Sequence, residues 1–395
     1  MLILNKGICS ATNIISNEKE RGTMKKLFSL LLASVMTVGL LAGCGGGSEA
    51  PADDAATGDV YNVCNLVNGN LGDKSFFDSA EAGLAKLAEE GKITYKTIEM
   101  GATDADQPKW LETLYEVAGT GEYDLIICGT YQMPEYLKEV ADQYPDQKFL
   151  IYDDTTHVGE NANVVNMSFK QNDLGYMVGV FAGSMTTSGF ENTNEDAVLG
   201  FLGGVDSPVI NDFLYGYLEG AKSVNPDVKV DTRYVTNYYD TAYGKELALS
   251  MINDKNADIV WGVGGAAGNG GAEAAQETGK AWFIGVDSDQ ESTFGAELAA
   301  VTLTSGLKNV GDGICWFFDE WAAGNEYWGQ EVNLGIAEGG VGVVTVKNFT
   351  TVPQEVQDAL LAAQDAIVAG EIVVPSALAD GGNDAAIALR DSMQP

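Results

Sequence analysis

The stretch DIVWGVGGAAGNGGAEAAQETGKAWFIGVD, residues 258–287, shows which class of fold this chain adopts. It begins with a short apolar run, passes through a glycine-rich turn into a helical pattern at 268–278, and ends with a second apolar run from 281. Short, wholly apolar strands joined by a helix are typical of a parallel sheet that helices cover on both faces. The stretch therefore predicts a β-α-β unit.

The same alternation continues on both sides of this stretch. Further strands are expected at 60–67, 93–100, 124–129, 148–154, 163–169, 197–204 and 228–235, and further helices at 76–90, 106–118, 135–144, 173–187, 209–223 and 241–254. Together these make about nine apolar strands, too many for one compact doubly wound domain of ordinary size. We therefore expect two α/β domains.

Several expected strands end in a polar or glycine-rich turn. These turns are Asn68-Gly69-Asn70, Asp153-Asp154, Gly203-Gly204, Gly264-Gly265 and Asp287. In open α/β sheets, ligands bind beyond the carboxyl ends of the strands. Two domains whose strand ends face each other would form a ligand-binding cleft.

The N-terminal region indicates export. Lys25 and Lys26 precede an apolar run of about 15 residues that ends in Leu41-Ala42-Gly43-Cys44, a pattern typical of a secretory signal. The run is short for a membrane span, which needs about 20 residues. Its last four residues resemble the lipobox of bacterial lipoproteins, whose cysteine is lipidated and becomes the new N-terminus. An ordinary signal peptide is the alternative.

From the lipobox we expect residues 1–43 to be removed and Cys44 to carry the lipid. Met24 is a natural start, so residues 1–23 are interpreted as an upstream misreading of the gene. Residues 45–58, rich in Gly, Ser, Ala, Pro and Asp, are expected to form a flexible linker. The protein would then sit on the outer face of the bacterial plasma membrane.

The charge of the chain limits its partners. It has 57 acidic and 22 basic residues, a formal net charge of −35. Such a surface repels nucleic acid and anionic lipid headgroups. Attachment to a membrane must therefore come from the lipid, and diacylglyceryl modification supplies the two acyl chains that stable anchoring needs.

The cysteines and histidine give little support to metal or nucleophilic chemistry. Cys64, Cys128 and Cys315 lie in apolar contexts without zinc-ligand spacing and are interpreted as small buried hydrophobic residues. A Cys64–Cys128 disulfide is the alternative. His157 is the single histidine, and no Ser or Cys nucleophile can be paired with it from the sequence.

The segment GNLGDKSFFDSAEAGL, residues 69–84, reads as a turn that leads into a helix. Ser75 is the expected N-cap, with Asp78 three residues later completing an approximate capping box. Phe76 and Phe77 are adjacent at the helix start, so one can face the cleft while the other packs in the core. Alternatively both belong to the core.

Two further motifs leave alternatives open. The loop GVGGAAGNGG, residues 262–271, meets the crude criterion for a dinucleotide fingerprint, although Ala267 stands where the third glycine is strictest. The same glycines would serve any site where the backbone must approach a ligand. Asp287 after an apolar strand suits ligand hydroxyls, and a calcium site is the alternative, although no DxDxDG loop is present. We expect no cofactor, no metal and no catalytic residue.

These pieces together resemble the basic membrane protein, or purine nucleoside receptor A (PnrA)-like, lipoproteins, which are substrate-binding proteins of ABC transporters. The resemblance covers nearly all of residues 59–350. It rests on GDKSFFDSAEAGL (72–84), KFLIYDD (148–154), FLGGVDSPVINDFLYGYLEGAK (201–222), YYDTAYGKELA (238–248), WGVGGAAGNGGAEAA (261–275), FIGVDSDQ (283–290) and LTSGLK (303–308).

The resemblance implies the type I periplasmic-binding fold, in which two doubly wound α/β lobes are joined by a three-segment hinge. The N-terminal lobe would comprise residues 59–168 and 305–343, and the C-terminal lobe 169–304 and 344–395. The protein would be a monomer that closes on its ligand and hands it to a permease driven by a cytoplasmic ATPase. It would catalyse no reaction.

The resemblance also implies a binding site. Phe76 and Tyr238 would sandwich a purine, while Asp153, Asp287 and Lys308 would hold the ribose hydroxyls. Gly264 would line the pocket, and Asn68 and Phe77 are further candidates. Two positions depart from the family pattern: Phe77 replaces an Asn, and the turn Asn68-Gly69-Asn70 lacks the Asp that reads the base.

The expected function is therefore capture of a nucleoside-like solute outside the cell. Three alternatives remain: a binding protein for ribose or another small hydroxylated solute, a receptor that feeds a signalling sensor, and an enzyme.

Overall fold

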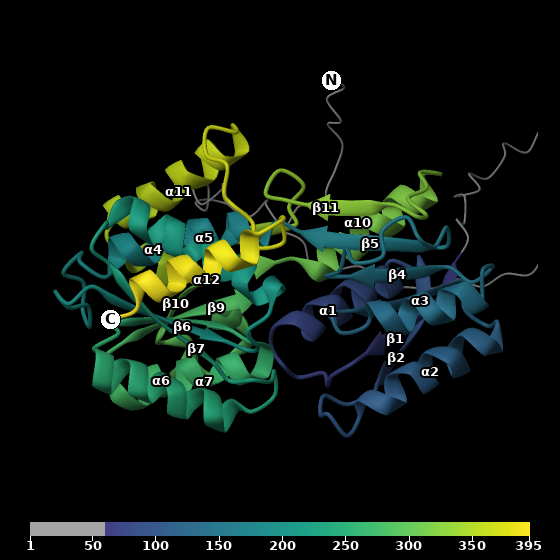
Figure 1. Ribbon diagram of the computed structural model, residues 1–395, viewed down its shortest axis with the longest axis horizontal. Helices are drawn as coiled ribbons and strands as arrows, with labels where there is room; N and C mark the ends of the chain where they lie inside the picture. Colours follow the sequence, from purple (N-terminus) through teal and green to yellow (C-terminus); the bar gives the residue numbers. More distant parts are fainter. Residues whose placement is uncertain (1–59) are drawn as a thin grey trace, which may run out of the picture. The chain divides into compact units, whose positions relative to one another are not determined.

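The computed structural model describes residues 60–395, and every structural statement below concerns this part of the chain. The predicted signal peptide (1–43), Cys44 and the linker (45–58) lie outside the described residues. Within 60–395, twelve strands form two six-stranded sheets, each covered by helices on both faces (Figure 1). The predicted fold class, two doubly wound α/β lobes, is confirmed.

The first lobe contains an all-parallel sheet with strand order β11-β5-β4-β3-β1-β2. Its strands are β1 (Tyr61–Val67), β2 (Ile93–Glu99), β3 (Leu125–Gly129), β4 (Phe149–Tyr152), β5 (Val164–Phe169) and β11 (Glu331–Leu334). Helices α1 (Phe76–Glu89) and α10 (Val310–Ala322) cover one face, and α2 (Gln107–Thr120) and α3 (Pro134–Gln143) cover the other.

The second lobe contains a sheet with order β12-β10-β9-β8-β6-β7, in which only the β10–β12 pair is antiparallel. Its strands are β6 (Val198–Gly203), β7 (Lys229–Tyr234), β8 (Ile259–Val263), β9 (Trp282–Asp287), β10 (Thr302–Lys308) and β12 (Val341–Val343). Helices α4 (Gln171–Met185) and α5 (Pro208–Val224) lie on one face, and α6 (Thr241–Lys255) and α7 (Gly265–Thr278) lie on the other. The short helices α8 (Gln290–Thr293), α9 (Ala296–Ala299) and η1 (Lys347–Thr351) complete it.

Three segments connect the lobes. By sheet membership the chain passes between them after β5, after β10, and between β11 and β12. The predicted lobe boundaries would instead divide β10 at 304/305 and place β12 in the first lobe. Sequence patterns locate element ends only to within a few residues, and both strands are short or partly polar. Exact boundaries remain a prediction.

Helices α4 and α5 pack with their backbones almost in contact. A Cβ atom at Gly175 would lie 2.2 Å from the carbonyl oxygen of Phe213, and one at Gly179 would lie 2.2 Å from that of Tyr217. On the partner helix, a Cβ at Gly216 would lie 2.0 Å from the carbonyl oxygen of Asn172. Only glycine allows this approach, so the two helices form one tightly joined pair.

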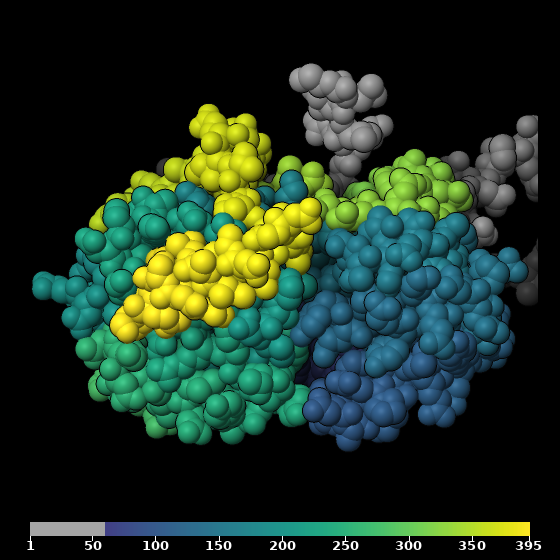
Figure 2. Space-filling model, viewed as in Figure 1, coloured from purple at the N-terminus to yellow at the C-terminus, as the bar shows by residue number. Residues whose placement is uncertain are grey.

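The C-terminal region encloses this helix pair. Helix α11 (Gln354–Val368) packs against α4, and α12 (Gly382–Met393) packs against α5. Figure 2 shows α12 (yellow) lying across the surface of the second lobe. In residues 60–395, no helix combines the length and the apolar character needed to span a membrane.

The cysteines of the described chain are buried, as predicted. Cys64 and Cys128 lie on neighbouring strands of the first sheet but form no disulfide. Burial raises the pKa of the Cys64 thiol to about 11, so this thiol stays protonated at neutral pH.

Candidate ligand-binding site

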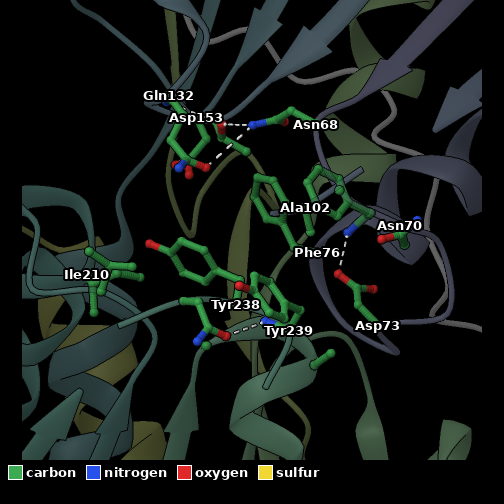
Figure 3. Close-up of a pocket in the computed structure, with 18 of the residues that line it drawn as sticks. Asn68, Asn70, Asp73, Phe76, Ala102, Gln132, Asp153, Ile210, Tyr238 and Tyr239 are labelled. Carbon is green, nitrogen blue, oxygen red and sulfur yellow. Dashed lines mark hydrogen bonds between the residues drawn. The ribbon is translucent and has the colours of Figure 1, made fainter. Parts of the chain in front are cut away.

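A cavity of about 220 Å³ lies between the carboxyl ends of the two sheets (Figure 3). Both lobes contribute to its wall, and all the predicted site residues of the described chain line it: Asn68, Phe76, Phe77, Asp153, Tyr238, Gly264, Asp287 and Lys308. The structure therefore brings together residues that are up to 240 positions apart in the sequence.

Strand ends place most of these side chains. Asn68 follows β1 and Asp153 follows β4, whereas Asp287 and Lys308 are the last residues of β9 and β10. Asp153 and Asp287 both adopt a left-handed backbone conformation, with φ of 67° and 65°. Asp tolerates this conformation better than most residues, so the chain can turn sharply out of each strand at the cavity.

Lys308 is the charged centre of the cavity and is only 1% exposed. Its ammonium forms an ion pair with the carboxylate of Asp153 across the two lobes. It also lies 5.5 Å from the ring centroid of Phe76, 5.5 Å from that of Phe169 and 5.2 Å from that of Phe213. Aromatic faces attract a desolvated cation, so this cage compensates in part for the lost water.

Two acidic side chains, Asp153 and Asp287, lie near the single ammonium group of Lys308. Burial raises the pKa of Asp287 to about 7, and the nearby Lys308 lowers it only in part. Burial also raises the pKa of Asp153, again opposed by Lys308. One cation thus faces two buried acids, whose carboxyl oxygens are available as acceptors for hydroxyl donors.

Aromatic side chains enter the cavity from both lobes. Phe76 starts α1 and packs against Tyr152 and Phe77, with ring centroids 5.4 and 5.3 Å apart. Tyr238 comes from the loop after β7, and its hydroxyl lies 3.1 Å from that of Tyr131 in the first lobe. Figure 3 shows Phe76 and Tyr238 pointing into the cavity.

Phe77 has a different position. A Cβ atom at Gly69 would lie 2.3 Å from its ring, so the Phe77 ring rests directly on the turn that follows β1. Phe77 both lines the cavity and supports this turn.

Ser75 is the N-cap residue of α1, as predicted, but the expected capping bond of its side chain is absent. Its hydroxyl makes no cap bond in α1 and instead donates to the carboxylate of Asp287, at 2.6 Å, in the other lobe. The carboxylate of Asp73 accepts the N–H groups of Ser75, Phe77 and Asp78 at 3.0–3.2 Å. Because an acid two residues earlier satisfies the helix N-terminus, the serine is available for the contact between lobes.

Further bonds join the lobes beside the cavity. The carbonyl oxygens of three successive residues, 73–75, each accept a hydrogen bond from the second lobe. The donors are Asn269 Nδ2 at 3.1 Å, Gln290 Nε2 at 3.2 Å and Ser288 Oγ at 2.9 Å. We call residues 73–75 and these three side chains the latch. It holds the lobes in a closed arrangement.

Sequence reasoning missed several residues that line the cavity. Thr130, Tyr131 and Gln132 follow β3, and Val209, Ile210 and Phe213 lie in the first turns of α5. The strand-end rule that identified Asn68 and Asp153 would also have found the first group, because the strand 124–129 was predicted. No local pattern identifies the second group.

The alternative sites receive no support from the described residues. Glycines of 262–271 allow close packing: a Cβ at Gly264 would lie 3.0 Å from the backbone of Gly204, and one at Gly270 would lie 2.3 Å from Lys245 in α6. Gly264 and Gly265 also line the cavity. No cluster of three or more potential metal ligands occurs in residues 60–395. His157 is bonded to Glu135 and Glu160, both at 3.0 Å, outside the cavity.

Known proteins are similar to this chain along most of its length. The family described as "ABC transporter substrate-binding protein PnrA-like" matches residues 60–377. The CD4+ T-cell-stimulating antigen of Listeria innocua is 31% identical over 370 residues, covering 89% of this chain and 99% of that protein. The ABC transporter nucleoside-binding protein BmpA of Lactococcus lactis is 29% identical over 367 residues, with coverage of 89% and 99%.

A solved structure shows the same arrangement. The ABC transporter solute-binding protein of Aeropyrum pernix superposes with a TM-score of 0.70 at 25% identity, covering 85% of this chain and 99% of that one.

Proposed function

This chain belongs to the PnrA-like family of ABC transporter substrate-binding proteins, and on that premise we propose that it captures a nucleoside between its lobes for an ABC importer. Proteins of this kind bind a small solute and deliver it to a permease in the membrane. The observation that carries the nucleoside assignment is the pairing of aromatic rings with a carboxylate–lysine cluster in one cavity. The relative in Lactococcus lactis bears the name of a nucleoside-binding protein.

The aromatic side chains suit a flat base. Phe76 and Tyr238 approach the cavity from opposite lobes. A base inserted between them would stack on both rings, and such contacts add to the free energy gained by burying the base. Closure of the lobes would complete the sandwich.

The charged cluster suits a sugar with neighbouring hydroxyls. Asp153 and Asp287 offer acceptors, and the ammonium of Lys308 offers donors. Hydrogen bonds to charged groups are stronger than neutral ones, so a ribose would be held firmly although it carries no charge. A free base would lack this part of the interaction.

Ligand binding would shift the balance between open and closed lobes. The closed form already has the latch and the Lys308–Asp153 ion pair. A ligand that contacts both lobes binds this form more tightly and increases its population by that difference in affinity.

We also propose that the mature protein is tethered to the outer side of the membrane through lipid on Cys44, with residues 45–58 as spacer. The lipobox-like sequence supports this assignment. Mass spectrometry of the protein from its native membrane tests it: a diacylglyceryl group on an N-terminal Cys44 is expected, and an unmodified mature N-terminus contradicts it.

Isothermal titration calorimetry with purine and pyrimidine nucleosides, ribose and free bases tests the function. Nucleoside binding tighter than about millimolar is expected, and Asp287→Ala should weaken it at least about tenfold, which is about 1.4 kcal/mol. Asp227→Ala, an exposed acid of the same lobe, is the matched control and should bind normally.

The other outcomes are equally informative. If no nucleoside binds, the proposal is wrong, and selective binding of ribose would indicate a sugar-binding protein. Normal affinity in the Asp287→Ala variant would show that the ligand occupies another part of the molecule.

A further inference from the structure

The chain between α11 and α12 is fastened to both helices that cover one face of the second sheet. We call residues 374–377, which lie in this connection, the strap. The side-chain amide of Asn172, at the start of α4, donates to the first two carbonyl oxygens of the strap at 2.9 and 3.4 Å. The carboxylate of Asp212, in α5, accepts the Ser376 hydroxyl and the N–H group that follows it, both at 2.7 Å. The strap therefore ties the first turns of α4 and α5 to each other.

Asp212 depends on these hydrogen bonds. Its side chain belongs to a residue that is only 1% exposed, and both donors from the strap reach the same oxygen atom, Oδ1. Burial raises the pKa of Asp212 to about 6, and the bonds from Ser376 and Ala377 lower it only in part. A buried carboxylate without donors is costly, so loss of the strap contacts would disturb α5 at this residue.

The two fastened segments carry two of the three rings that surround Lys308. Phe169 lies three residues before Asn172, and Phe213 directly follows Asp212. The centroids of these two rings lie 5.5 and 5.2 Å from the ammonium of Lys308. Neither the strap nor Asp212 lines the ligand cavity. Any effect of the strap on a ligand must therefore pass through the backbone of α4 and α5.

Close packing does not fix the strap on the side that faces Phe169. A second cavity, of about 560 Å³, is lined by Phe169, Asp212, Val374 and Ser376 among other residues, and it shares no lining residue with the ligand cavity. Protein interiors are otherwise packed closely enough to hold side chains in place by contact. Where a cavity replaces such contact, the hydrogen bonds of Asn172 and Asp212 determine where the strap lies.

We propose that the strap, acting through Asn172 and Asp212, is a positioning element of the ligand site, which holds Phe169 and Phe213 against the ammonium of Lys308 and so raises the affinity for a ligand bound there. The inference rests on the proposed nucleoside function, because a nucleoside is the probe. Asp212 touches no ligand in this scheme. It acts on the cavity from behind, by fixing the turn of α5 that carries Phe213.

Calorimetry with adenosine measures this effect. Asp212→Leu has a similar size but accepts no hydrogen bond, and it should weaken adenosine binding about tenfold. Ser376→Ala removes one of the two bonds and should weaken binding about threefold. Because both donors reach Oδ1, Asp212→Asn can still accept them and should recover most of the affinity that Asp212→Leu loses.

The double variant and a matched control separate positioning from a general loss of stability. Asp212→Leu combined with Ser376→Ala should bind no more weakly than Asp212→Leu alone, because the two changes remove the same contact. Ser392→Ala, an exposed serine of α12 whose hydroxyl bonds within its own helix, should bind normally. The fitted stoichiometry reports the fraction of folded protein, so a role in stability alone would lower the stoichiometry and leave the affinity unchanged.

The remaining outcomes distinguish this inference from the proposed function. Normal adenosine affinity in folded Asp212→Leu overturns the strap's role and leaves nucleoside binding standing. Equal losses in Asp212→Asn and Asp212→Leu also overturn it, because they would assign the effect to the charge of Asp212. If Asp212→Leu does not fold, Ser376→Ala decides the question, and unchanged affinity there contradicts the proposal. Failure of every nucleoside to bind the unmodified protein overturns both proposals.

Discussion

Asp287 combines deep burial with contacts to both sides of the cavity. It accepts a hydrogen bond from Ser75, lies near Lys308, and has a pKa raised to about 7 by burial. In the proposed role as an acceptor for ligand hydroxyls, its ionised form makes the stronger hydrogen bonds. Below its pKa, binding therefore favours release of a proton, and the affinity falls as the pH falls.

This gives a prediction for pH dependence. Between about pH 5.5 and 8.5, the affinity for a nucleoside should rise with pH, by at most about tenfold per pH unit below the pKa. Asp287→Asn, which does not titrate, should bind more weakly and lose most of this dependence. Calorimetry across the pH range measures both effects, and an equal slope in the variant would assign the titration to Asp153 or Asp73.

For single residues, the rule that ligands bind beyond strand ends led to side chains that line the cavity. Asp153 and Asp287 follow apolar runs and were identified for that reason. The N-cap position of Ser75 was predicted correctly, but the partner of its hydroxyl was not, because that partner is 212 residues away. Contacts of this kind depend on how the lobes close, which no local pattern encodes.

Among the helices and strands, the α4–α5 pair places a strict limit on side-chain size, because the two backbones are almost in contact. The Cβ of an alanine at position 179 would lie 2.2 Å from the carbonyl oxygen of Tyr217, and a backbone atom cannot move aside as a flexible side chain can. We expect Gly179→Ala to lower the free energy of unfolding by about 1–3 kcal/mol. Gly295→Ala, where no atom lies within 4 Å of the added Cβ, should change it little.

Urea denaturation of both variants checks this prediction. If Gly179→Ala is as stable as Gly295→Ala, the helices are not in the close contact described.

All nine predicted strands exist. Seven of them are largely apolar runs, whereas β2 and β7 carry several polar residues. The sequence did not identify β10, β11 or β12: β10 contains Thr302, Thr304, Ser305 and Lys308, and the other two have only four and three residues. These strands belong to the hinge region, where pairing between distant segments rather than local pattern forms the strand.

At the scale of the whole molecule, we expect the latch to affect ligand affinity, because its hydrogen bonds stabilise the closed arrangement of the lobes. Ser288→Ala removes one latch bond without touching the cavity wall, since Ser288 does not line it. Loss of about 0.5–1.5 kcal/mol from the closed form should weaken every ligand by the same factor, about two- to tenfold, and leave their order of preference unchanged. Ser250→Ala, whose hydroxyl bonds within α6, is the control.

Calorimetry with three nucleosides and small-angle scattering of the ligand-free protein test this prediction together. A larger average radius in Ser288→Ala should accompany the loss of affinity. A change in ligand order would instead mean that Ser288 contacts the ligand itself.

Lys308 has one more consequence, which arises from where β10 ends. It is the last residue before the chain passes into the first lobe, and it pairs with Val341 of β12 in another connecting segment. In both sheets the strands nearest the connections stand at one side, while Asn68 and Tyr238 lie toward the opposite side. The lobes would thus rotate about an axis close to Lys308, so that residues beside it move little and those after β1 and β7 move farther. A solute held at Lys308 would therefore contact a part of the cavity that stays nearly fixed while the lobes close, whereas the turns after β1 and β7 would approach it from farther away.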